Sequence, residues 1–138
     1  MLRSSSEGTI REVDDLTDPR DLAIEAAEAA ASKKAGDIVI LHIGPLIEIT
    51  DYFVICSGTS ERQVATIAEE IERRLRALGA KAFRREGERE RRWVLLDYLD
   101  FVVHVFHQQD REFYELERLW KDASRVEFST DRVGTEAG

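Results

Sequence analysis

An apolar stripe at helical spacing between residues 60 and 79 is the clearest pattern in the chain. Charged residues fill many of the positions between its members, so one face of a helix would be buried and the other solvated. Ser60 and Gln63 have the spacing of a capping box at the start of this helix, and Gly79 marks its end. The predicted buried stripe consists of Val64, Ile67, Ala68, Ile71, Leu75 and Leu78.

A second helix is predicted nearer the amino terminus, from Asp18 and Pro19 to about Lys34. Asp18 can accept hydrogen bonds from the free amide groups of a first turn, and Pro19 has the backbone angle that suits the first helical position. The inner stripe is rich in alanine, which permits a close approach to a sheet: Leu22, Ala26 and Ala30.

Five segments between turn residues predict strands, and most of them are rich in β-branched and aromatic residues. They cover residues 37–43, 52–57, 81–85, 92–98 and 101–107. A last helix is expected over residues 110–120, where apolar positions again recur at helical spacing: Phe113, Leu116 and Trp120. The predicted order is αββαβββα, an α/β fold in which helices pack on a mixed five-stranded sheet.

The length of 138 residues fits a single domain with one core. We expect this domain over residues 17–126, with loosely held tails at 1–16 and 127–138. The chain is 43% hydrophobic and 35% charged, which is typical of a well-solvated globular protein. No apolar run approaches the roughly 18 residues that span a bilayer, and the first residues lack a secretion signal, so we expect a cytoplasmic protein without membrane contact.

Charge and cysteine content narrow the function further. The net charge of -8 repels phosphate backbones, so a protein partner fits better than direct binding to nucleic acid. Cys56 is the only cysteine of the sequence and lies in an apolar run, where it is expected to pack as a small hydrophobic residue.

The segment of residues 92–98 is apolar on both sides of the predicted strand. Alternation places Trp93, Leu95 and Asp97 on one face and Val94 and Leu96 on the other, with Tyr98 at the turn. If helices cover only one side of the sheet, Trp93 and Leu95 face water, and an exposed aromatic surface marks an interface. The alternative is that a helix covers this side too, which makes Trp93 a core residue.

Three long segments resemble the ribosomal silencing factor (Iojap) family: LAIEAAEAAASKKAGDIVIL, ITDYFVICSGTSERQV and RWVLLDYLDFVVHVFHQQDREFYELERLW. The resemblance covers about residues 22–126. It implies a nucleotidyltransferase-like fold without transferase activity, and a homodimer. It also implies binding to the large ribosomal subunit through the fourteenth large-subunit ribosomal protein, with a steric block of small-subunit joining when nutrients are scarce.

The resemblance favours the interface interpretation of the Trp93 face. The predicted partner-binding residues are Trp93, Leu95, Asp97 and Tyr98, with His104 and Tyr114 as weaker candidates. A ribosome-assembly factor would need the same surface, so the sequence leaves that alternative open.

An enzyme that uses a nucleotide is the other alternative. The turn Gly58-Thr59-Ser60 resembles the turn by which nucleotidyltransferases hold a triphosphate. Those enzymes also need paired carboxylates one residue apart on a neighbouring strand to hold magnesium, and no such pair follows the turn. Asp97 and Asp100 are three residues apart across a turn, so their side chains point apart and do not form such a pair. We therefore expect the turn Gly58-Thr59-Ser60 to be a helix cap, and we expect no catalysis.

Neither a metal nor another cofactor is expected. His104 and His107 are three residues apart on a strand, and alternation sends them to opposite faces. Residues 84–92 carry five arginines and three glutamates, which predicts a solvated hairpin. A minor contact of these arginines with ribosomal RNA phosphates is the alternative.

Overall fold

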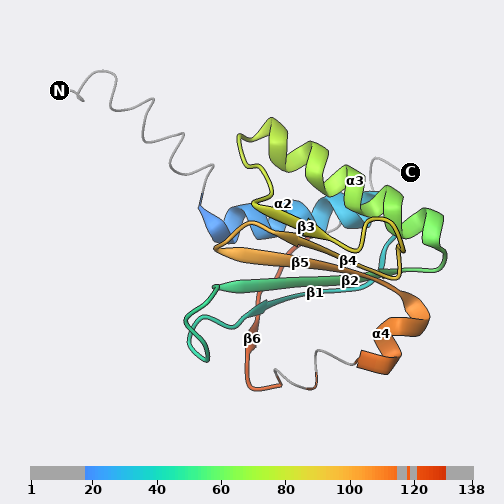
Figure 1. Cartoon of the computed structure of the whole chain (residues 1–138). Coiled ribbons are helices and arrows are strands. Elements are labelled where there is room, and N and C mark those ends of the chain that lie inside the picture. The colour runs from blue at the N-terminus through green and yellow to red at the C-terminus, as the bar shows by residue number, and fades with distance from the viewer. Residues whose placement is uncertain (1–17, 115–117, 119–120, 130–138) are drawn as a thin grey trace.

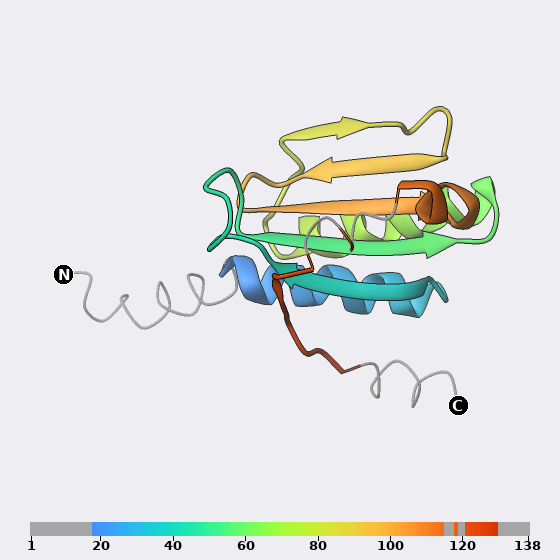
Figure 2. The ribbon, with the colours of Figure 1, turned by 90° about the horizontal axis from the view of Figure 1, so that it is seen from below.

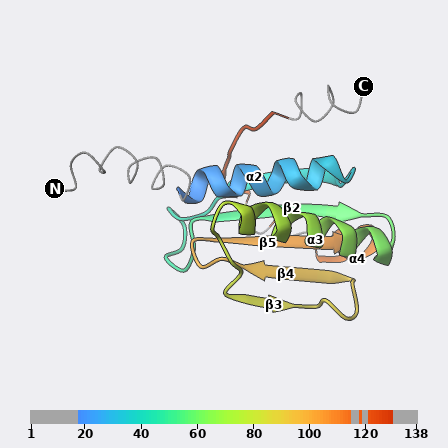
Figure 3. The same ribbon diagram turned by 90° about the horizontal axis from the view of Figure 1, so that it is seen from above.

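The computed structural model describes residues 18–114, 118 and 121–129. Two long helices, α2 (Pro19–Ser32) and α3 (Glu61–Ala77), lie side by side on one face of a sheet, as Figures 1 and 3 show. A short helix, α4 (Gln108–Tyr114), lies on the opposite side of the sheet (Figure 1). The strands are β1 (Gly36–His42), β2 (Tyr52–Gly58), β3 (Arg84–Glu86), β4 (Trp93–Asp97), β5 (Phe101–His107) and β6 (Ser124–Arg125).

The described strands form one six-stranded sheet in the order β3-β4-β5-β2-β1-β6. The central neighbours β2 and β5 run parallel, while the other four pairs are antiparallel. A parallel pair needs a long crossover, and here the chain passes from β2 through α3 to the edge strand β3 and returns through β4. The mixed α/β fold is therefore confirmed, but the predicted count of five strands is wrong.

The sixth strand, β6, has only two residues, and so short a segment shows no alternation that could predict it. It pairs with β1 through Leu41 opposite Arg125. Beyond it, Phe128 packs against the main core, while residues 1–17 and 130–138 lie outside the described part. The nucleotidyltransferase-like order that the resemblance implies stays a prediction.

The main core lies between the two long helices and the sheet. The predicted stripe of α2 is buried, and so are five of the six residues predicted for α3, with Leu78 partly buried. Cys56 is fully buried in this core, as predicted, and burial raises the pKa of its thiol to about 12.

Both helices begin where the sequence predicts. The Asp18 carboxylate accepts a hydrogen bond from the Arg20 amide at 2.9 Å, and the Ser60 hydroxyl accepts one from the Gln63 amide at 3.0 Å. The second half of the capping box is shifted by one residue, because the Gln63 side chain accepts from the Thr59 amide.

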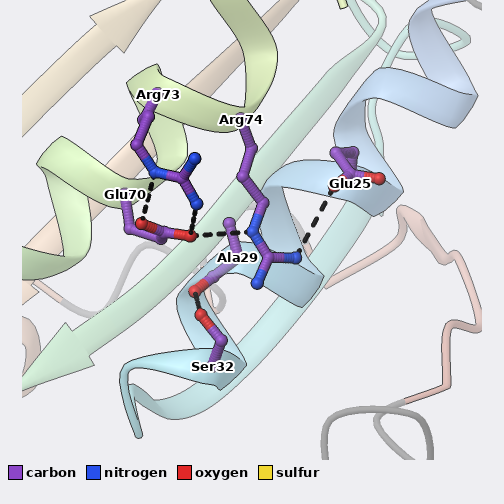
Figure 4. Close-up of polar contacts among 6 residues, drawn as sticks. All are labelled: Glu25, Ala29, Ser32, Glu70, Arg73 and Arg74. Atoms are coloured by element: carbon purple, nitrogen blue, oxygen red, sulfur yellow. Dashed lines mark hydrogen bonds and ion pairs between the residues drawn. The ribbon is translucent and has the colours of Figure 1, made fainter. Parts of the chain in front are cut away.

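Charged side chains join the outer surfaces of the two helices (Figure 4). Glu70 accepts hydrogen bonds from Arg73 on the same helix at 2.7 Å and from Arg74 at 2.9 Å. Arg74 also reaches Glu25 of α2 at 3.6 Å (Figure 4). The hydrogen bonds from the Arg73 guanidinium lower the pKa of Glu70 to about 2, with a further contribution from Arg74.

Two other elements differ from their predicted limits. The strand predicted over residues 81–85 is only the short edge strand β3, and Phe83 before it is exposed. The last helix begins at Gln108, two residues earlier than predicted. The side chains of residues 112–117, 119 and 120, including those of Phe113, Leu116 and Trp120, lie outside the described part. Within the residues described, no helix has the length and apolar character needed to cross a membrane.

Candidate functional site: the open face of the sheet

The sheet face opposite α2 and α3 is called the open face here, because α4 covers only one end of it (Figure 2). Strand pairing aligns its side chains in rows that cross several strands. One row runs through Phe53, Val102, Asp97 and Arg84. The next row runs through Ile55, His104, Leu95 and Glu86, and a third joins Ser57, Phe106 and Trp93.

Trp93 lies on the open face and is half-buried. Its indole ring stacks on Phe106 with centroids 4.9 Å apart, and its Nε1–H donates a hydrogen bond to Nδ1 of His104 at 3.1 Å. The predicted alternation of β4 is confirmed, because Val94 and Leu96 are buried on the helix side. One part of the Trp93 side chain thus packs against its neighbours on the open face, and the other part remains accessible to a partner.

His104 is buried at the centre of this face, next to Trp93 and Phe53. Burial lowers the pKa of its imidazole to about 4, because the cation would lose its hydration there. Since Nδ1 accepts the indole hydrogen, the neutral ring carries its proton on Nε2. His104 therefore orients the indole of Trp93 as a neutral hydrogen-bond acceptor.

Asp97 ends β4 and has two hydrogen-bond partners among the described residues. Its carboxylate accepts a hydrogen bond from the Leu99 amide at 2.8 Å and faces the guanidinium of Arg84 at 3.4 Å. The first bond supports the turn in which Leu99 has a φ of 73°. Asp97 is thus part of the turn as well as of the open face.

The structure brings together four of the six predicted site residues on this face: Trp93, Leu95, Asp97 and His104. Tyr98 is placed elsewhere, since it stacks on Phe101 in the main core with centroids 4.8 Å apart. Burial raises the pKa of its phenol to about 12. Tyr114 is the last residue of α4, and its side chain lies outside the described part.

The β1–β2 loop and α4 lie toward opposite ends of the sheet (Figure 2). A hollow lies on the open face between this loop and the row that contains Val102. We call it the end cavity. Its volume is about 410 Å³, and most of its surface is apolar. Its lining consists of Ile47, Ile49, Thr50, Phe53, Arg84, Leu95, Asp97, Val102 and His104.

Sequence reasoning missed most of this cavity. Phe53 and Val102 belong to segments that were predicted as strands, so alternation alone could have placed each on one face of its own strand. The parallel pairing that sets Phe53 opposite Val102 joins distant segments, and no local pattern signals it. Ile49, in the loop, is 86% exposed at the rim.

The turn Gly58-Thr59-Ser60 is a helix cap in the structure. Its amide at Thr59 and its hydroxyl at Ser60 both bond to Gln63, whose side-chain nitrogen also donates to the Lys33 and Lys34 carbonyls at 3.1 Å. These groups serve the packing of α3 against the end of α2. Among the described residues, no three His, Cys, Asp or Glu side chains come together in a way that could hold a metal ion.

The arginine-rich segment forms β3 and the turn before β4, at the edge of the sheet (Figure 2). Arg85 pairs with Glu72 of α3 and with Glu88, both at 3.2 Å. Arg92 pairs with Asp110 of α4 at 2.8 Å. These pairs support the hairpin prediction, and the RNA contact stays a prediction.

Comparisons with known proteins point to one family. Residues 16–137 match the family model described as "Ribosomal silencing factor during starvation". A protein of Halalkalibacterium halodurans named ribosomal silencing factor RsfS is 45% identical over 102 residues, which are 74% of this chain and 87% of that protein. The mouse protein named mitochondrial assembly of ribosomal large subunit protein 1 is 33% identical over 64% of this chain and 40% of its own length. A crystal structure of a Chromobacterium violaceum protein has a TM-score of 0.74 and 30% identity, covering 76% of this chain and 88% of the other.

Proposed function

Because the chain belongs to the ribosomal silencing factor family, we propose that it binds the large ribosomal subunit and keeps the small subunit from joining it. The proposed contact is with the fourteenth large-subunit ribosomal protein, in the cytoplasm, and the result is lower translation when nutrients are scarce. The mechanism is steric, since the bound domain occupies space that the small subunit needs. No nucleotide turnover is part of it.

The observation that carries the proposal is the incompletely covered apolar surface of the open face. Trp93 and Leu95 are only half-buried there, although the opposite side of the same strand is fully packed. An aromatic and aliphatic surface of this kind is typical of the centre of a protein interface. The net charge of -8 adds attraction to a basic protein partner such as a ribosomal protein.

Sedimentation of purified subunits tests the proposal directly. With the protein present, we expect large subunits to carry it in the gradient and to form fewer joined ribosomes with small subunits. Trp93→Ala should weaken this binding about thirtyfold, the effect of losing roughly 2 kcal/mol at an aromatic hot spot. Phe83→Ala is the matched control, because it removes an exposed aromatic ring that does not belong to the rows of the open face.

Two results would count against the proposal. One is normal subunit joining in the presence of excess protein. The other is normal binding by a folded Trp93→Ala variant, which would place the interface on another surface. The melting temperature of each variant shows whether it is folded.

A role in large-subunit assembly is the second candidate, and the name of the mouse relative favours it. The same open face would then contact immature large particles. Sedimentation separates the two roles, because an assembly factor associates with precursor particles and leaves the joining of finished subunits unchanged.

We also propose that the free protein is a homodimer, since the described residues leave part of an apolar face uncovered. Light scattering over a dilution series tests this. A mass that stays at one chain at every concentration would contradict the dimer.

A further inference from the structure

Two side chains that line the end cavity carry buried polar atoms without a hydrogen-bond partner among the described residues: Oγ1 of Thr50 and Nε2 of His104. Thr50 is 6% exposed and His104 is 5% exposed. A buried polar atom that stays unpaired costs free energy, so two of them beside one hollow call for an explanation. A group that enters the cavity from outside would supply the missing partners.

We propose that the end cavity receives an aliphatic side chain of the protein partner, together with neighbouring backbone groups of the partner that bond to Thr50 and His104. The proposal rests on the proposed function, because the partner is the ribosomal protein that docks on the open face. It adds a specific subsite to that interface, next to Trp93 and separate from it.

The chemistry of the two atoms favours neutral backbone groups. His104 carries its proton on Nε2 and offers a donor, while the Thr50 hydroxyl can donate or accept. The backbone of a partner offers carbonyl acceptors and amide donors, so it can satisfy each atom. A carboxylate or phosphate could accept from both groups, but it would lose more hydration on entering an apolar cavity.

The charges around the cavity also favour a neutral occupant. Arg84 and Asp97 are the charged residues of its lining, and they pair with each other at 3.4 Å. The rest of the lining is mainly aliphatic and aromatic, which suits a branched side chain. Ile49 at the rim adds apolar surface around the entrance.

Both unpaired atoms are shielded from water, so the partner's backbone groups reach them after a small shift of neighbouring side chains. The cavity is open on its outer side, and the exposed Ile49 has room to move. Side-chain changes of this size are common when protein partners bind.

Filling the cavity is the first test. Val102→Phe places an aromatic ring in the lining. Ile38→Phe is the matched control, because Ile38 is a half-buried residue of β1 that packs against the main core on the helix side of the sheet. Pelleting with purified large subunits should show at least about a tenfold loss of affinity for Val102→Phe, the effect of excluding one buried aliphatic side chain. Ile38→Phe should bind as the unchanged protein does.

The second test keeps the shape of the lining. Thr50→Val removes the unpaired hydroxyl, so the melting temperature should rise while affinity for large subunits falls about two- to tenfold. Thr59→Val is the control, because the Thr59 hydroxyl already bonds to Gln63 at 3.0 Å. Its melting temperature should fall slightly, with unchanged affinity. A purely structural role for Thr50 cannot produce a more stable protein that binds less well.

The outcomes distinguish a failure of the cavity proposal from a failure of the proposed function. If Val102→Phe does not fold, the binding of Thr50→Val alone tests the cavity proposal. Unchanged binding by Thr50→Val and by folded Val102→Phe, with a loss for Trp93→Ala, would overturn the cavity proposal and leave the proposed function intact. If Val102→Phe binds large subunits normally but has a lower average mass in light scattering, because less of it is dimeric, the cavity would be assigned to a second copy of the chain. If the unchanged protein does not pellet with large subunits, the proposed function fails first.

Discussion

The buried imidazole of His104 should make the domain less stable as the pH falls through the mildly acid range. Burial lowers its pKa in the folded protein to about 4, against 6.5 for an ordinary histidine. The unfolded chain therefore takes up a proton below pH 6.5 that the folded chain binds only near pH 4. The stability that depends on neutral His104 is complete above this window and is lost as the pH falls through it.

The size of the effect follows from the two pKa values. One unit of difference corresponds to about 1.4 kcal/mol, so the loss reaches about 2 kcal/mol at about pH 5 and about 3 kcal/mol at about pH 4. The imidazole is 5% exposed, so solvent screens this effect little. A loss of this size is a large part of the roughly 5–15 kcal/mol by which single domains are usually stable.

Urea unfolding measured at steps between about pH 8 and about pH 4 tests this prediction. His104→Asn is the control, because its side-chain oxygen can still accept the Trp93 hydrogen bond but does not titrate. The difference between the two pH profiles isolates His104 from the other titrating groups. If both proteins lose stability in parallel through this range, His104 is not a buried neutral histidine and the reasoning is wrong.

Three further substitutions test single contacts, each by its effect on the urea unfolding midpoint. Trp93→Phe leaves Nδ1 of His104 without its donor and should cost about 1–3 kcal/mol, so an unchanged midpoint would contradict this bond. Gly87 has a φ of 81°, and an added Cβ would lie 2.0 Å from the Trp93 carbonyl oxygen. Gly87→Ala should therefore cost more than the roughly 1–3 kcal/mol of backbone strain alone, and wild-type stability would refute the turn geometry. Glu70→Gln should lower the free energy of unfolding by about 1 kcal/mol at neutral pH. It should also remove the part of the stability that is lost as the pH falls from 4.5 to about 2. If the variant still loses this stability in acid, the loss belongs to another carboxylate.

Local patterns were enough to predict the helices and most strands, because periodicity is a property of neighbouring residues. The stripe of α3 and the alternation of β4 were correct for this reason. Tyr98 shows the limit of the method. It was predicted at the turn after residues 92–97, as a partner-binding residue, but its ring stacks on Phe101 in the main core, next to the turn at Leu99.

The end cavity could not be predicted from any one segment. Its wall combines the β1–β2 loop with side chains from β2, β3, β4 and β5, and only the sheet order makes them neighbours. The unpaired atoms of Thr50 and His104 are also a property of the packed structure. A sequence shows that a threonine or histidine is present, but not whether its hydrogen bonds are satisfied.

The parallel pairing of β2 with β5 has a consequence for folding during synthesis. Strand β2 (residues 52–58) can pair with β5 (residues 101–107) only after β5 has been synthesised, and β5 is made long after β2. The centre of the sheet therefore forms late. Contacts between such distant segments form slowly, after the local helices. The open face is built from both strands, so a nascent chain that ends before β5 lacks the surface for its partner. A factor made on ribosomes therefore acquires the proposed ribosome-binding surface only after most of its own synthesis is complete.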